Sequence, residues 1–257
     1  MALQRHSFLG RLKGASPFRK WEKVLQSPQE IPTPELTGLG AEMRAWRHKI
    51  DRMGAAVETE MLSRVTAVDG IDRPDQCDWA ERSGPWHHAV RPRAHVNLAS
   101  PTEIGSGVKL FYDANYADMS LRQDRVPSHV IGSTYGLVME IYRFDGSFVS
   151  LVQDLPDAAL KGLTLNHFIA VHLNIECEQE IEVYSRLNVQ HGPNMEQMVR
   201  QVAIDGNRGV AEFDLAYAKI NEKRLEKAWI DLIFESPEMN RVALWDMVMV
   251  RAPRADI

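Results

Sequence analysis

The segment RLNVQHGPNMEQMVRQ, residues 186–201, gathers polar side chains around a Gly-Pro turn. Arg186, His191 and Asn194 are residue types that catalytic loops use, because imidazole moves protons while guanidinium and amide groups hold anions and hydroxyls. In the alternative, Gly192-Pro193 ends a strand, Asn194 hydrogen-bonds the turn backbone and His191 caps the sheet edge. We favour this second interpretation, which places His191 at the rim of a binding face.

Alternating apolar and polar side chains before the turn predict two strands, each with one apolar and one polar face. The first strand is LNHFIAVHLNIEC, residues 165–177, and the second covers residues 179–190. If the two strands are neighbours, their polar residues share one sheet face. That face would carry His172, Asn174, Tyr184, Arg186 and Asn188.

A strand predicted at 227–235 extends this polar set, because Trp229 and Asp231 lie opposite its apolar residues. A flat aromatic ring packs on the C–H face of a pyranose, and amide and guanidinium groups satisfy sugar hydroxyls. The ordinary solvated face of an antiparallel sheet has a similar composition. The candidate ligand-binding residues are His172, Asn174, Tyr184, Arg186, Asn188, His191, Trp229 and Asp231.

Catalytic motifs give little support for an enzyme. The chain has no Gly-x-Ser-x-Gly, Gly-rich phosphate loop or His-Glu-x-x-His sequence, so no catalytic residue is predicted. A glycosidase would need two carboxylates that face each other across a groove. The carboxylates that could supply such a pair are Glu176, Glu182, Asp214, Asp231 and Glu235.

The composition is that of a globular protein without bound metal. Hydrophobic residues make up 44% and charged residues 25% of 257 residues, and the net charge of -5 gives no reason to expect nucleic acid as a partner. Cys77 and Cys177 lack CxxC spacing, and the adjacent His87 and His88 lack the spacing of a metal motif. We therefore predict no metal or cofactor.

Without a recognisable signal or membrane span, the cytoplasm is the default location, and a peripheral or particle-associated position stays open.

The N-terminal segment is basic and amphipathic. Residues 1–23 contain six Lys or Arg and one acid, Glu22, interleaved with Phe, Leu and Trp. Such a segment could contact a protein partner or an anionic membrane surface through residues 1–26. The simpler interpretation is a leader that packs loosely on the domain.

The whole chain divides into four segments. Three prolines and two glycines make residues 27–40 a linker after the leader, so 1–40 form one segment. Apolar residues at spacings of three and four predict an amphipathic helix at 41–67, which lies on a sheet or pairs with another helix. Residues 68–94 read as a loop held by Trp79 and Trp86, and 95–257 as a β domain. The helix stripe is Met43, Trp46, Ile50, Met53, Val57, Met61 and Val65.

Short Val-, Ile- and Tyr-rich runs separated by turn signals predict an antiparallel β-sandwich of jelly-roll type, preceded by the helix. The sequence LVMEIYRF-DG-SFVSLVQDL predicts a hairpin at Asp145-Gly146. In the final strand, 241–251, Val242, Leu244, Val248 and Val250 form the predicted inward set. The predicted outward set is Arg241, Trp245, Met247, Met249 and Arg251.

Three stretches, 144–156 (FDGSFVSLVQDLP), 186–201 and 213–257, resemble a family of uncharacterised alphaproteobacterial proteins, a domain of unknown function. This resemblance implies no activity. The ending IDLIF-E-SPEMN-R-VALWDMVMV, residues 230–250, also resembles the final strands of galactose-binding-like and carbohydrate-binding jelly rolls. The second resemblance implies a glycan-binding sheet face, although a shared fold does not establish function.

These observations leave three hypotheses. The first is a non-catalytic binding module that recognises a polysaccharide or another extended polar ligand on a sheet face. The second is a structural or adaptor protein of a cell envelope or a phage-like gene-transfer particle, docked through its N-terminal segment. The third is an enzyme that acts on carbohydrate.

Overall fold

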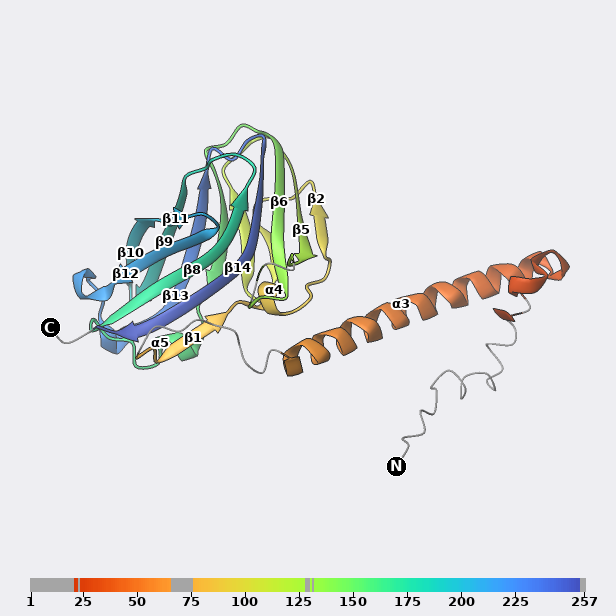
Figure 1. Cartoon of the computed structure of the whole chain (residues 1–257), viewed down its shortest axis with the longest axis horizontal. Coiled ribbons are helices and arrows are strands. Elements are labelled where there is room, and N and C mark those ends of the chain that lie inside the picture. Colours follow the sequence, from red (N-terminus) through yellow and green to blue (C-terminus); the bar gives the residue numbers. More distant parts are fainter. Residues whose placement is uncertain (1–20, 23, 66–75, 128–129, 131, 255–257) are drawn as a thin grey trace, which may run out of the picture. The chain divides into compact units, whose positions relative to one another are not determined.

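The computed structural model describes residues 21–22, 24–65, 76–127, 130 and 132–254 (Figure 1). The described residues up to Glu58 form one compact unit and those from Thr59 onward a second. Most of the basic leader therefore lies outside the described residues.

The first unit contains a 3-10 turn, Pro28–Glu30, and most of the long helix α3, Thr33–Val65, whose last seven residues, 59–65, belong to the second unit. The helix begins at Thr33 and not at residue 41, so the last part of the predicted linker is helical. Pro34 occupies the first turn, where a missing N–H costs no hydrogen bond and the fixed φ angle suits a helix. Pro34 therefore marks where the helix starts, although its sequence context suggested a linker.

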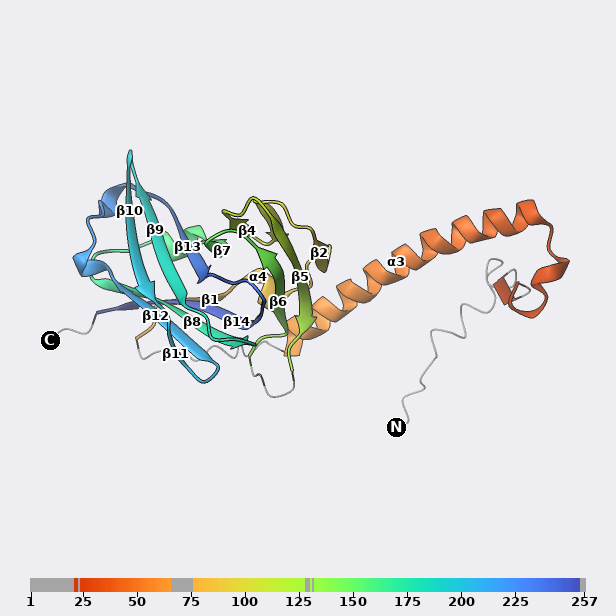
Figure 2. The same ribbon diagram turned by 90° about the horizontal axis from the view of Figure 1, so that it is seen from above.

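The second unit is built from two antiparallel sheets, which Figure 2 shows from above. The eight-stranded sheet has the order β11-β12-β8-β14-β6-β5-β2, with β1 paired to β14; the six-stranded sheet has the order β10-β9-β13-β7-β4-β3. Strands of the first sheet are β1 (Trp79–Arg82), β2 (Ala94–Val96), β5 (Ala117–Arg125), β6 (Tyr135–Phe144), β8 (His167–Cys177), β11 (Ala203–Asp205), β12 (Arg208–Asp214) and β14 (Asn240–Pro253). Strands of the second are β3 (Thr102–Gly105), β4 (Val108–Tyr112), β7 (Phe148–Asp154), β9 (Val183–His191), β10 (Asn194–Gln201) and β13 (Leu225–Glu235).

Short helical turns join some of these strands: α4 (Gly84–His87), α5 (Asp157–Leu160), η2 (Leu215–Tyr217) and η3 (Glu222–Arg224). The chain passes repeatedly from one sheet to the other, as between β6 and β7, β8 and β9, and β13 and β14. The predicted antiparallel β-sandwich with an N-terminal helix is therefore confirmed, and these crossings are of the jelly-roll kind.

One apolar core fills the space between the sheets. It draws inward-facing side chains from both, among them Val171 and Ile175 of β8 and Leu187 of β9. Trp86 of α4 is fully buried in it, and its indole N–H donates to the Leu244 carbonyl at 2.9 Å. The predicted loop at 68–94 thus contains a strand and a helical turn, and Trp86 anchors it to the core by burial.

The prediction of a hairpin at Asp145-Gly146 is wrong, because β6 and β7 belong to different sheets. Glycine is required here by close approach and not by a two-residue turn. A Cβ on Gly146 would lie 2.7 Å from the Ala114 amide nitrogen. The Asp113 carboxylate accepts hydrogen bonds from the backbone N–H groups of Ser147 and Phe148, at 2.7 and 3.1 Å. These contacts shape the connection as an arch between the sheets.

The predicted parity of the last strand is also wrong beyond its middle. The pairing of β14 with β8 shifts between Leu244 and Asp246, which marks a β-bulge at Trp245. A bulge inserts one residue and so reverses which face the following side chains occupy. Met247 and Met249 consequently join the core, although the sequence alternation placed Val248 and Val250 there.

Candidate functional site

The structure separates the predicted site residues into two groups. His172 and Asn174 lie on β8 in the eight-stranded sheet, opposite Val248 and Asp246 of β14. Tyr184, Arg186 and Asn188 lie on β9 in the six-stranded sheet. The predicted shared face of these two strands is therefore wrong, because the chain crosses to the other sheet between Cys177 and Val183.

The second group does converge with the residues of β13. Trp229 pairs with Asn188, Asp231 with Arg186, and Ile233 with Tyr184. Residues directly opposite each other in a sheet share a face, and the alternate residues of these strands belong to the core. Five of the eight candidate residues therefore lie together on the outward face of the six-stranded sheet.

Three rows of side chains cross this face, and we call them together the polar face. The first row is Gln201, Tyr184, Ile233, Ser150 and Phe111; the second is Val199, Arg186, Asp231, Val152 and Lys109; the third is Gln197, Asn188, Trp229 and Asp154. Tyr184 and Trp229 stand four residues apart along the strands, which is about 13 Å. The face is therefore long enough for several sugar residues of an extended chain.

A buried hydrogen-bond network forms the centre of the polar face. Arg186 Nε donates to Asp231 Oδ2 at 2.6 Å, and Arg186 Nη2 lies 2.5 Å from the same oxygen. Asn188 Nδ2 also donates to Asp231 Oδ2, at 3.2 Å, while Gln197 Nε2 donates to Asn188 Oδ1 at 2.8 Å. Asn188 and Asp231 are only 1% and 3% exposed, although they face away from the core. Three strands are thus linked by a network that holds each polar group in one orientation.

Arg186 is the accessible member of this network. Its side chain is 37% exposed, while its partner Asp231 is 4% exposed. A guanidinium has five N–H donors in a rigid fork, so those that do not contact Asp231 can bind ligand hydroxyls. The buried carboxylate fixes the orientation of the fork before any ligand arrives.

Half-buried aromatic rings flank the network. Trp229 lies beside Asn188, and Lys227 Nζ sits 5.4 Å from the centre of its ring. Lys227 also forms an ion pair with Asp154 at 2.9 Å. Tyr184 donates its hydroxyl to Glu182 at 2.8 Å, which raises the pKa of the tyrosine. The rings therefore offer apolar surfaces within a face whose charges are already paired.

His191 is not part of the polar face, contrary to the sequence prediction. It follows the inward parity of β9 and is 6% exposed. The Gly192-Pro193 turn does join β9 and β10 as a hairpin, with Gly192 at a φ of 60° and Asn194 paired with His191. The strand corner was thus predicted correctly, but the side chain of His191 points toward the core.

The carboxylates considered for catalysis are distributed over both sheets. Glu176 and Asp214 belong to β8 and β12, whereas Asp231 and Glu235 belong to β13. Most of them have other partners: Asp231 pairs with Arg186, Asp214 Oδ1 accepts from the Ala216 N–H, and Glu176 Oε1 accepts from Asn207.

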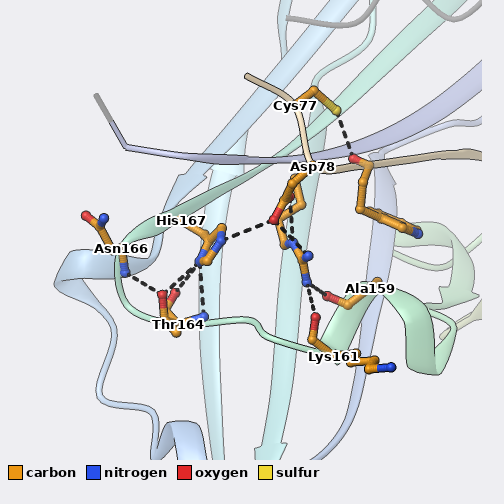
Figure 3. A network of polar contacts seen from close by, with 9 residues as sticks. Cys77, Asp78, Ala159, Lys161, Thr164, Asn166 and His167 are labelled. Atoms are coloured by element: carbon orange, nitrogen blue, oxygen red, sulfur yellow. Dashed lines mark hydrogen bonds and ion pairs between the residues drawn. The ribbon is translucent and has the colours of Figure 1, made fainter. Parts of the chain in front are cut away.

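A second polar network, drawn in Figure 3, lies at the beginning of β8, near the place where β1 pairs with β14. Arg251 donates from Nε and Nη2 to the two carboxylate oxygens of Asp78, both at 2.9 Å, and from Nη1 to the carbonyls of Ala159 and Lys161. His167 Nε2 lies 3.4 Å from Asp78, and its Nδ1 lies 2.8 Å from the Thr164 hydroxyl.

A hydroxyl, an imidazole and a carboxylate in a row have the order of groups found in a catalytic triad. Here the carboxylate of Asp78 is held by two donors of Arg251, and the backbone N–H of Thr164 also donates to His167 Nδ1. The arrangement therefore ties β1 and the segment before β8 to β14. The sequence prediction missed this network, because it placed Arg251 on the outward face of the last strand. In the structure the side chain of Arg251 is buried.

An open cleft of about 800 Å³ adjoins the polar face at Gln201, where the link between β8 and β9 meets the hairpin of β11 and β12. Ile175, Cys177 and Val202 line it together with Glu180 and Glu182. Burial raises the pKa of the Cys177 thiol to about 11, so this cysteine stays a neutral thiol at physiological pH.

Sequence reasoning also missed residues that β4, β7 and β10 bring to the polar face: Lys109, Phe111, Asp154 and Gln197. Their parity could have been read from the alternation, but nothing local identifies β7 as the neighbour of β13.

Residues 1–257 match the model of a family described as a family of unknown function (DUF6478). The chain belongs to this family. Membership in DUF6478 agrees with the resemblance to a domain of unknown function seen in the sequence, and it brings no activity. The search of curated proteins found no match.

Some solved structures are remotely similar to this DUF6478 member. The enzymatically active domain of tailspike protein 4 from bacteriophage CBA120 has a TM-score of 0.40 and 6% identity, over 56% of this chain and 19% of that one. The family 11 carbohydrate-binding module of Clostridium thermocellum, in complex with a β-1,3-1,4-mixed-linked tetrasaccharide, has a TM-score of 0.37 and 12% identity, over 61% and 99%. The CBM22-1 xylan-binding domain of Paenibacillus barcinonensis Xyn10C has a TM-score of 0.35 and 8% identity, over 63% and 94%.

No helix among the described residues is both long and apolar enough to cross a membrane.

Proposed function

We propose that the chain is a non-catalytic module that binds a neutral polysaccharide on the polar face. The observation that carries the proposal is the buried network of Arg186, Asn188 and Asp231 on an outward sheet face. On an ordinary solvated face, charges and amides extend into water. Here an amide and a carboxylate are covered and hold an exposed guanidinium in place, which is the preorganisation that a polar ligand needs.

Charge pairing on the face favours a neutral ligand. Arg186 is matched by Asp231, Lys227 by Asp154 at 2.9 Å, and Lys109 by Glu103 at 3.9 Å. An acidic polymer would require unmatched cations to replace the counterions it gives up. A hydroxyl-rich neutral chain can instead use the remaining donors and acceptors without breaking these pairs.

The aromatic rings supply the apolar part of the surface. Trp229 and Tyr184 are half-buried and lie on neighbouring strands, and Phe111 continues the row of Tyr184 on the far side of Ser150. Sugar rings present C–H faces that pack on aromatic planes while their hydroxyls reach polar neighbours. A site of this kind recognises an extended chain and not one charged group.

The test is a titration of the full chain with soluble neutral polysaccharides (xylan, β-glucan and galactan) and soluble acidic ones (alginate and polygalacturonate). Isothermal titration calorimetry and retarded migration in polysaccharide-containing native gels give the affinities. We expect saturable binding of at least one neutral polymer. Failure to bind any of them, or binding of the acidic polymers alone, would contradict the proposal.

Asp231→Asn is expected to lower the ratio of neutral to acidic polysaccharide affinity by about tenfold, or roughly 1.4 kcal/mol. The substitution keeps the shape of the side chain but leaves Arg186 without its counter-charge, so the face gains one net positive charge. The same titrations measure the ratio. Asp205→Asn makes the same change at an exposed position on β11 of the other sheet, and it should leave the ratio unchanged. An equal ratio for Asp231→Asn and the wild type would count against the role of this pair.

A further inference from the structure

The apolar stripe of α3 follows a strict heptad pattern. Counting from Leu36, apolar residues occupy each first and fourth position of successive seven-residue repeats up to Val57. The average spacing of 3.5 residues is that of a coiled-coil seam, not of a helix that packs on a sheet. These seam residues are Leu36, Leu39, Met43, Trp46, Ile50, Met53 and Val57.

Most of the seam is exposed. Ile50, Met53 and Val57 are 57%, 60% and 58% exposed, whereas Leu39, nearer the start of the helix, is 7% exposed, and Trp46 is in edge-to-face contact with Trp21 of the same chain. A continuous row of exposed large apolar side chains marks an interaction surface. Helical stability in proteins also comes mainly from packing of an apolar face, so a helix of 33 residues is expected to have a partner along this row.

The charges beside the seam indicate what that partner is. Glu42 precedes the first position of one heptad and Arg47 follows the fourth position of the same heptad. In a parallel, in-register pair of identical helices, the position just before the first residue of a heptad faces the position just after the fourth residue of that heptad on the other helix. Glu42 of one copy then faces Arg47 of the second, and symmetry provides this opposite-charge contact twice.

An antiparallel pair is less compatible with the same residues. If it places Met43 opposite Met53 and Trp46 opposite Ile50, Arg47 faces Arg47 of the second copy and Lys49 faces Lys49. Two like-charge contacts replace two favourable ones. We propose that α3 joins two copies of this chain as a parallel coiled coil through the exposed part of the seam, Met43–Val57.

Sedimentation equilibrium of the full chain tests the dimer. The wild type should be dimeric at micromolar concentration, and Ile50→Asp should weaken dimerisation at least about a hundredfold, because it places a charge in the seam. Ala45→Asp introduces the same side chain on the opposite, exposed side of the helix and should leave the dimer intact. A monomeric wild type at about 100 μM, or an unchanged dissociation constant for Ile50→Asp, would overturn the proposal.

Charge reversal tests the parallel register without placing a polar group in the seam. Glu42→Arg and Arg47→Glu should each weaken the dimer about tenfold, since each replaces two opposite-charge contacts with two like-charge contacts. The double variant restores the contacts with reversed signs and should return to within about threefold of the wild type. If the double variant is as weak as the sum of the single ones, the two residues do not face each other and the parallel register is wrong.

Discussion

Asp78→Ala is expected to lower the free energy of unfolding by about 2–3 kcal/mol. Its partner Arg251 has a side chain only 8% exposed, so the substitution leaves a buried cation with two carbonyls and no counter-charge. Removing one member of a fully buried ion pair costs roughly 3–5 kcal/mol. The carboxylate of Asp78 is 38% exposed, which reduces the expected loss.

The loss of unfolding free energy caused by Asp78→Ala should depend on pH in a defined direction. Hydrogen bonds from Arg251 hold the pKa of Asp78 below its usual range, against the opposing effect of burial. A carboxyl group with a lowered pKa stabilises the fold at every pH above its unfolded-state pKa, which is about 4. The difference in unfolding free energy between wild type and Asp78→Ala should therefore be constant at neutral pH and shrink as pH falls below about 4.

Urea unfolding at pH 7 and at a series of acidic pH values measures this difference. Asp205→Ala is the matched control, because Asp205 is exposed on β11, and it should change stability by less than about 0.5 kcal/mol. Equal stability of Asp78→Ala and the control at pH 7 would show that the network in Figure 3 does not hold β1 against β14.

Trp229→Ala is expected to lower the affinity for the bound polysaccharide by about thirtyfold, or roughly 2 kcal/mol, because buried Trp side chains dominate binding energy at protein surfaces. The indole is half-buried beside Asn188 and offers the largest apolar plane on the polar face. Its loss should leave the fold intact, since the ring lies outside the core between the sheets. Calorimetric titration measures the change.

Tyr142→Ala provides the comparison for Trp229→Ala. Tyr142 is 48% exposed on β6, a strand of the other sheet, so its removal takes away an exposed aromatic ring that the polar face does not use. Its affinity should stay within about twofold of the wild type. A similar loss of affinity in both variants would mean that binding is not localised to the six-stranded sheet.

The sequence determined which way side chains point much better than which strands are neighbours. Tyr184, Arg186 and Asn188 were predicted on one face of their strand, and they lie there, because alternation is a local property of the chain. Their separation from His172 and Asn174 depends on a crossing between sheets that no local pattern encodes. Trp229 and Asp231 reached the same face by pairing that joins strands about 40 residues apart, which alternation cannot reveal.

At two positions the local sequence pattern predicted the wrong structure. The bulge at Trp245 reverses parity within β14, so Met247 and Met249 exchange faces with Val248 and Val250. Asp145-Gly146 has the composition of a hairpin turn, yet tertiary contacts to Asp113 and Ala114 make it an arch between sheets. In both cases the sequence signal was weaker than the packing that surrounds it.

The most direct test of polysaccharide binding follows the indole N–H signals of the six tryptophans by NMR during titration with the neutral polysaccharide that binds. Assignment comes from single Trp→Phe variants. We expect the Trp229 signal to shift and saturate with the calorimetric affinity, while the signals of Trp86 and Trp245, which are 0% and 4% exposed, stay in place. Saturable binding that leaves the Trp229 signal unmoved would contradict a binding site on the polar face.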